Sequence, residues 1–161
     1  MKRALVLAVA FLVVTVSGVV RADKASDEKA LRTLADQFVK DWDSDNWKGL
    51  AGVFAADGDL INPFGRVAKG RAEIEKVFMD EHTSFLKGTK FGLNAYAARL
   101  VAPDAAIEDW DVSVTGGKNA DGTDAPPLNH HVTVVLTKQG GKWWAAAARP
   151  MVYVPAPGAP K

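Results

Sequence analysis

The chain has 161 residues, with 20 Lys and Arg against 19 Asp and Glu, and it contains no cysteine. This near balance of charge gives no electrostatic reason to expect nucleic acid or an anionic membrane as a partner. The absence of cysteine excludes disulfides and thiolate metal sites, and the length suits one domain with its own hydrophobic core.

The first 22 residues have the order of segments found in secretory signal peptides. Lys2 and Arg3 form a positive start, an apolar run extends over residues 4–16, and Ala22 ends a segment suited to cleavage. The apolar run is shorter than the roughly 20 residues that span a bilayer, although a retained anchor is the alternative. We expect an exported protein, periplasmic or secreted, with no membrane association after cleavage. The remaining chain has 17 basic and 19 acidic residues, a net charge of −2.

The first half of the remaining chain has helical patterns. Ser26 is a suitable N-cap, and Leu31, Leu34, Phe38 and Trp42 recur at spacings of three and four, which predicts one apolar stripe on a helix. A second, short helix is expected over residues 47–56, a turn over 57–59, a short strand at 60–61, a loop over 65–70 and a third helix from about residue 71.

The second half has strand patterns, predicted over residues 91–101, 106–115, 128–138 and 143–154. Residues 155–161 form a proline-rich tail that we expect to be flexible. Helices placed ahead of antiparallel strands indicate an α+β fold. Such a sheet can curve around the helices and leave a ligand cavity between the two layers.

Several segments of this chain resemble a known family. Residues 38–42, 59–65, 69–74 and 140–144 are similar to segments of nuclear transport factor 2-like domains, most closely the SnoaL-like and SgcJ/EcaC-type group. The resemblance covers about residues 27–154 and implies a domain over 23–154. It implies a cone-shaped fold, with helices packed on a curved, mostly antiparallel sheet around a central pocket, and often a homodimer formed through the sheet. Members of the family include isomerases, cyclases, dehydratases and domains without catalysis, so the fold does not fix the activity.

The resemblance also argues against one activity. Ketosteroid isomerases of this superfamily place an aspartate base before a Pro-x-Gly turn, where this chain has Asn62. Their helix tyrosine aligns with Phe38, which has no hydroxyl to stabilise an oxyanion. Asn62 is left with two roles, which are to orient a ligand or to close the turn.

Two residues are candidate catalytic acids or bases. His82 lies about 40° and 80° around the helix from Phe78 and Ile74, so it borders the apolar stripe. The alternative is a histidine that binds the last carbonyl groups of the helix. Glu108 shares strand parity with Trp110, so its side chain would lie on an apolar face, where burial raises the pKa of a carboxyl group. The alternative is that the Glu108 side chain reaches solvent.

The expected pocket is lined by aromatic and polar side chains. His130 shares parity with the apolar residues of its strand, whereas His131 faces the other way. An alanine run over residues 145–148 would lower the cavity floor, and we expect Leu at 146 or 147 to block it. No His-x-His or His-x-x-x-His pair occurs, so neither a metal nor another cofactor is expected. The candidate ligand-binding residues are Phe38, Trp42, Asn62, Phe64, Trp110 and His130.

Three functions fit these patterns. The first is an exported domain that binds a small apolar or aromatic molecule. The second is an enzyme of the cyclase, dehydratase or hydrolase type, with His82 or Glu108 as acid or base and Asn62 orienting the substrate. The third is a dimeric accessory module without catalysis. Convergence of His82, Asn62 and Glu108 on one open cavity would favour the enzyme. A cavity without converging polar groups would favour binding, and a cavity filled by tryptophans would favour the module.

Overall fold

The computed structural model describes the backbone of residues 15–154 and the side chains from residue 24. The helices are α1 (Thr15–Asp43), α2 (Trp47–Gly52) and α3 (Gly70–His82). The strands are β1 (Phe54–Ile61), β2 (Val67–Lys69), β3 (Lys90–Ala102), β4 (Ala105–Thr115), β5 (Leu128–Gln139) and β6 (Lys142–Val152). Most of the expected leader and the whole proline-rich tail lie outside the described residues.

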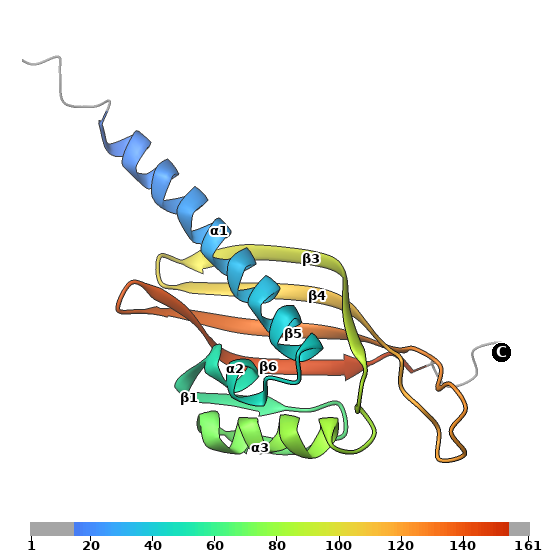
Figure 1. The fold of residues 1–161 in the computed structure, drawn as a ribbon. Helices are drawn as coiled ribbons and strands as arrows, with labels where there is room; N and C mark the ends of the chain where they lie inside the picture. The colour runs from blue at the N-terminus through green and yellow to red at the C-terminus, as the bar shows by residue number, and fades with distance from the viewer. Residues whose placement is uncertain (1–14, 155–161) are drawn as a thin grey trace, which may run out of the picture.

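One six-stranded mixed sheet forms the body of the domain. Its strand order is β2-β1-β6-β5-β4-β3, and β1 and β6 are parallel whereas every other pair of neighbours is antiparallel. The sheet curves without closing, α1 crosses one of its faces, and α2 and α3 gather beside β1 (Figure 1). The expected α+β class, with helices packed on a curved and mostly antiparallel sheet, is thus confirmed.

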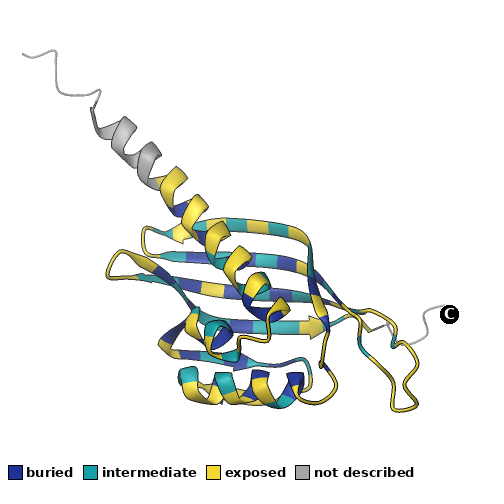
Figure 2. Ribbon diagram, viewed as in Figure 1, coloured by how far each residue is buried: buried dark blue, intermediate teal, exposed yellow. Residues whose placement is uncertain are grey.

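Alternation along the strands places the core on the face that α1 covers. In β4, Ala106, Glu108, Trp110, Val112 and Val114 are buried, and the residues between them are exposed or half-buried (Figure 2). Successive strand side chains point to opposite faces, so this pattern separates an inner face from an outer face. The predicted stripe of α1 packs on the inner face, with Leu31 and Trp42 buried and Leu34 and Phe38 partly buried.

Three local predictions were wrong. Ser26 is not an N-cap, because it lies inside α1, which is described from Thr15 to Asp43. Residues 54–56 are strand, and the expected turn at 57–59 lies inside β1, because this segment pairs in parallel with β6. The expected loop over residues 65–70 contains β2, which pairs with β1.

Gly58 explains how β1 passes so close to β6. A Cβ atom at this position would lie 2.7 Å from the carbonyl oxygen of Ala145, and the register of the two strands shifts between Phe54 and Asp59. Glycine permits this approach because it has no side chain. The same glycine, read in sequence between two aspartates, resembles a turn.

No helix among the described residues has the length and apolarity to cross a membrane.

Candidate functional site

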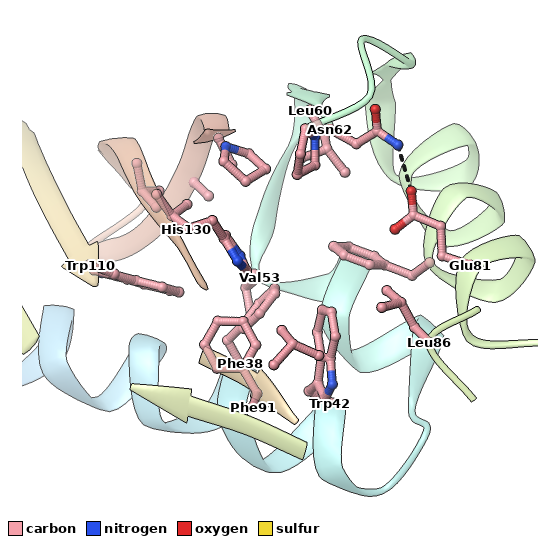
Figure 3. A pocket seen from close by; sticks show the side chains of 18 of the residues that line it. Phe38, Trp42, Val53, Leu60, Asn62, Glu81, Leu86, Phe91, Trp110 and His130 are labelled. Carbon is pink, nitrogen blue, oxygen red and sulfur yellow. Dashed lines mark hydrogen bonds between the residues drawn. The ribbon is translucent and has the colours of Figure 1, made fainter. Parts of the chain in front are cut away.

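A pocket opens between the inner face of the sheet and the helices, and it is almost entirely apolar (Figure 3). Its wall comes from α1, α3, the segment after α3, and strands β1, β3, β4, β5 and β6. Three polar side chains, Asn62, Glu81 and His130, line the pocket together with Pro63 and these apolar residues: Leu34, Phe38, Trp42, Val53, Phe54, Leu60, Phe64, Phe78, Phe85, Leu86, Phe91, Trp110, Val114, Leu128, Val132, Val134, Ala145, Ala148 and Pro150. The structure therefore brings all six residues expected to bind ligand to one cavity.

Aromatic rings pack edge to face along the wall. The ring centroid of Phe38 lies 5.4 Å from that of Phe91 and 5.7 Å from that of Trp110. Farther out, Phe64 and Phe85 are largely exposed and pack at 5.5 Å. Aromatic pairs prefer this geometry, and the rings present faces and edges to a ligand.

The floor of the pocket is formed by small side chains of β6. Ala145 and Ala148 line the pocket and are buried, although they are three residues apart. A bulge explains this spacing, because Val135 pairs with Ala147 whereas Leu136 pairs with Ala145. The alanine run therefore does contribute to the floor, but through residues 145 and 148 and not through residues 146 and 147, at which Leu was expected to block the pocket, because the bulge shifts the strand parity.

Asn62 and Glu81 form a hydrogen-bonded pair in the pocket. Asn62 follows β1, and its Nδ2 donates to Oε1 of Glu81, near the end of α3, at 2.6 Å. Asn62 Oδ1 accepts hydrogen bonds from the backbone N–H groups of Phe64 at 3.1 Å and Arg66 at 2.7 Å. Asn62 thus closes the turn, as one of its two predicted roles requires, and its side chain also lines the pocket while it donates to Glu81; the orientation of a ligand by Asn62 stays a prediction. Burial raises the pKa of Glu81.

His130 extends from β5 toward the pocket, as its strand parity predicts (Figure 3). Its Nδ1 lies 3.4 Å from the carbonyl oxygen of Leu128. Burial lowers the pKa of His130, so the neutral ring is favoured. His131 lies on the outer face between the carboxylates of Asp109 and Asp111, which raise its pKa.

His82 is buried but does not line the pocket. Its ring lies 4.3 Å from the ring of Trp42 and 4.5 Å from that of Trp47, measured between centroids. Nδ1 faces the Asp45 carboxylate at 3.3 Å, and Nε2 has no hydrogen-bond partner in the described part of the chain. Burial lowers the pKa of His82. The structure therefore places this candidate catalytic residue in a tryptophan cage behind the pocket wall.

Glu108 is also buried away from the pocket lining. Its carboxylate accepts hydrogen bonds from the Tyr96 hydroxyl and the Trp110 indole N–H, each at 3.0 Å. Burial raises its pKa to about 7, so of the two alternatives that the sequence left open the buried one holds and the solvent-exposed one does not; burial raises the pKa of Tyr96 as well. Because both oxygens are engaged by the protein, Glu108 supports Trp110, which does line the pocket.

Glu81 is the polar pocket residue that the sequence reasoning missed. It lies three residues after Phe78 and seven after Ile74, which places it within about 60° and 20° of them around the helix. It is therefore closer to the apolar stripe than His82. The helical spacing that made His82 a candidate could therefore also have identified Glu81.

No group of three or more His, Asp or Glu side chains within the described residues is arranged to hold a metal ion.

The fold and the pocket together define a nuclear transport factor 2-like domain. The family model of the SnoaL-like domain matches residues 35–146, which is more than half of the chain. The protein belongs to this family. No curated protein sequence matches the chain.

Solved structures show the same fold at low sequence identity. A hexachlorocyclohexane dehydrochlorinase (LinA, type 2) is similar with a TM-score of 0.75 and 14% identity, over 86% of this chain and 99% of that one. An uncharacterised protein with a cystatin-like fold from Caulobacter vibrioides has a TM-score of 0.71 and 21% identity, over 80% and 90%. A protein from Novosphingobium aromaticivorans that is described as a scytalone dehydratase is similar with a TM-score of 0.70 and 15% identity, over 83% of this chain and 89% of that one. At these identities the likeness shows the fold alone.

Proposed function

We propose that this protein is an exported domain that binds a small, largely apolar molecule in the pocket between α1, α3 and the sheet. One observation carries the proposal: aromatic and aliphatic side chains line a cavity that holds three polar groups, Asn62, Glu81 and His130. Ligand sites in proteins combine an apolar wall with a few polar groups that orient the ligand.

Native mass spectrometry of the protein purified from its host tests this function. We expect a population whose mass exceeds that of the chain by one small molecule. Ala148→Leu, which fills the pocket floor, should lose that population, whereas Ala147→Leu, outside the pocket lining, should keep it. Protein without any bound molecule, combined with no uptake of apolar probes, would contradict the proposal.

Export is supported by the N-terminal pattern and by the way α1 packs. The first half of α1 extends beyond the sheet (Figure 1). Residues 24–26 are exposed, and Asp27 is the first buried residue of the described side chains. Cleavage after Ala22 would therefore leave these contacts of α1 intact. Intact-mass measurement of the protein from the periplasm or medium should find Asp23 at the N-terminus, and an uncut chain would indicate an anchor.

We also propose that the outer face of the sheet forms a homodimer. Large apolar side chains on or beside this face are exposed, including Val135 and Met151, which are 41% and 52% exposed. Light scattering should give the mass of a dimer, and Val135→Lys should shift it toward the monomer. A monomeric wild-type protein would contradict this contact.

A second function, acid–base catalysis, is favoured by one observation. Glu81 has a raised pKa in an apolar pocket, and such groups accept and release protons efficiently. In an elimination, the carboxylate would take a proton from carbon, the C–H electron pair would form the double bond, and the leaving group would depart with its bonding pair. Hexachlorocyclohexane is a suitable probe because a neighbour in fold is a dehydrochlorinase of that compound. Chloride release by the wild type and not by Glu81→Gln would support catalysis, and no release by either would argue against this elimination.

A further inference from the structure

The orientation of the Asn62 side chain is fixed by its backbone partners. Two backbone N–H groups donate to Oδ1, at 3.1 and 2.7 Å, so this atom must be the carbonyl oxygen of the amide. The amide nitrogen therefore faces Glu81, to which it donates at 2.6 Å. An aspartate at position 62 would place two carboxylates in contact here, whereas the amide supplies the donor that the Glu81 carboxylate requires.

Only one oxygen of Glu81 is engaged by this contact. Oε1 accepts from Asn62, and no other described residue donates to the carboxylate. The side chain is 9% exposed, and its second oxygen, Oε2, is turned toward the pocket (Figure 3). Oε2 is reached from the pocket, so a ligand that covers it displaces water from this acceptor. A ligand that supplies a donor there replaces the lost hydrogen bond, whereas a ligand without a donor leaves the acceptor unpaired.

His130 presents a second acceptor to the same pocket. Its Nδ1 faces the carbonyl oxygen of Leu128, which only accepts hydrogen bonds, so the proton of the neutral ring belongs on Nδ1. Nε2 then carries a lone pair. The two pocket groups that are not committed to protein donors, Glu81 Oε2 and His130 Nε2, are therefore both acceptors.

Positive charge is missing from the pocket wall. None of the described residues that line it is Lys or Arg. The nearby Arg66 forms an ion pair with Asp80 at 2.7 Å. A carboxylate or phosphate ligand would meet the Glu81 carboxylate without a compensating cation, so anionic ligands are disfavoured.

We propose that the pocket selects uncharged ring compounds that carry a hydroxyl group, and that the hydroxyl donates to Oε2 of Glu81. Asn62 is a positioning residue, since it holds the carboxylate without occupying the second oxygen. The inference rests on the proposed ligand-binding function and adds the chemical class of the ligand. It requires that a phenol binds better than its methyl ether, although the ether is the more apolar of the two.

Fluorine NMR titration with 4-fluorophenol and 4-fluoroanisole tests this directly. The two probes share a fluorinated ring and differ in the hydroxyl donor. Near neutral pH a phenol is un-ionised, so charge does not complicate the comparison. A hydrogen bond to a charged acceptor predicts that 4-fluorophenol binds the wild type at least about tenfold more tightly than 4-fluoroanisole.

Glu81→Gln supplies the decisive variant. The glutamine oxygen would accept from Asn62, which turns the glutamine amide, a donor, toward the ligand. We expect the ratio of the two dissociation constants to fall to about one, whereas Glu75→Gln, on the same helix and outside the pocket lining, should keep the wild-type ratio. Asn62→Ala should reduce the ratio to an intermediate value, because the carboxylate loses its fixed orientation.

The outcomes separate the ligand class from the function itself. Equal binding of both probes by the wild type would overturn the selection of hydroxyl compounds and leave a general apolar pocket. A preference for the phenol that persists in Glu81→Gln would overturn the role of Glu81. Failure of both probes to bind at millimolar concentration would overturn the proposed function and this inference with it.

Discussion

Substitution of Glu108 by glutamine should remove a large part of the pH dependence of stability. Glu108 is 0% exposed, and its carboxylate accepts hydrogen bonds from Tyr96 and Trp110. Glutamine retains this geometry, because its oxygen accepts from the indole N–H and its amide donates to the tyrosine oxygen. The variant therefore removes the charge without leaving a buried polar group unpaired.

The sign and size of the effect follow from the pKa of Glu108. Burial raises this pKa from an ordinary value of 4.5 to about 7 in the folded protein. The folded state thus binds the proton more tightly than the unfolded chain, and stability falls as the pH rises from about 4.5 to about 7. The full shift corresponds to about 3 kcal/mol of unfolding free energy, of which about 2–3 kcal/mol falls between pH 5 and pH 8.

Urea denaturation of both proteins across this pH range measures the effect. We expect the unfolding free energy of Glu108→Gln to rise relative to the wild type as the pH increases, by about 2–3 kcal/mol from pH 5 to pH 8. Glu108→Leu should be less stable than Glu108→Gln at every pH, by about 1–3 kcal/mol, because it leaves the buried indole N–H of Trp110 and the half-buried hydroxyl of Tyr96 without their acceptor. A constant difference between the wild type and Glu108→Gln would refute the account of this carboxylate.

Three further predictions follow from the other sites. Ala148→Leu should weaken the binding of 4-fluorophenol at least about tenfold at a stability cost of about 1–3 kcal/mol, in a fluorine NMR titration in which Ala147→Leu binds normally. Burial lowers the pKa of His82, so its contribution to stability is present above pH 6.5 and lost as the pH falls below it. In urea titrations, His82→Phe should lose less unfolding free energy than the wild type as the pH falls below 6.5. An equal loss in both proteins would mean that other groups cause the acid destabilisation. His131 should titrate above 6.5 by NMR because Asp111 hydrogen-bonds to it, and Asp111→Asn should lower that pKa; no change would remove Asp111 as the cause.

The elements with a clear period were predictable from the sequence. The four long strands alternate in polarity, and their observed bounds differ from the predicted ones by no more than two residues. The stripe of α1 was predictable for the same reason, because its spacing matches one helical face. Strand parity also placed His130 in the pocket and His131 outside it.

The errors arose where contacts distant in sequence override the local pattern. Gly58 has the local sequence of a turn, and residues 54–56 continue a helical pattern. Both adopt a strand conformation because they lie beside β6 in the folded protein. The bulge in β6, which moves the pocket floor to Ala145 and Ala148, has no local signature in an alanine run. These features depend on tertiary pairing, which single-segment propensities do not contain.

The sequence predicted the residues that line the pocket better than it predicted the acid–base residues. Aromatic and amide side chains were assigned to the pocket because they lie on the faces of elements that the periodicity orients toward the core. The acid–base candidates were less well placed, because burial alone does not distinguish a pocket from the space behind its wall. His82 and Glu108 are both buried, but tryptophan and tyrosine side chains of the protein occupy their surroundings.

The indole signals of the five tryptophans test the central claim most directly. Trp42 and Trp110 line the pocket, whereas Trp144 lies outside the lining, where the guanidinium of Arg71 covers its ring at 4.7 Å. In a ¹H–¹⁵N spectrum of the labelled protein, titration with 4-fluorophenol should shift the indole resonances of Trp42 and Trp110 together and leave that of Trp144 in place. Shifts confined to Trp144, or no shift at a saturating concentration, would contradict a ligand-binding pocket between the helices and the sheet.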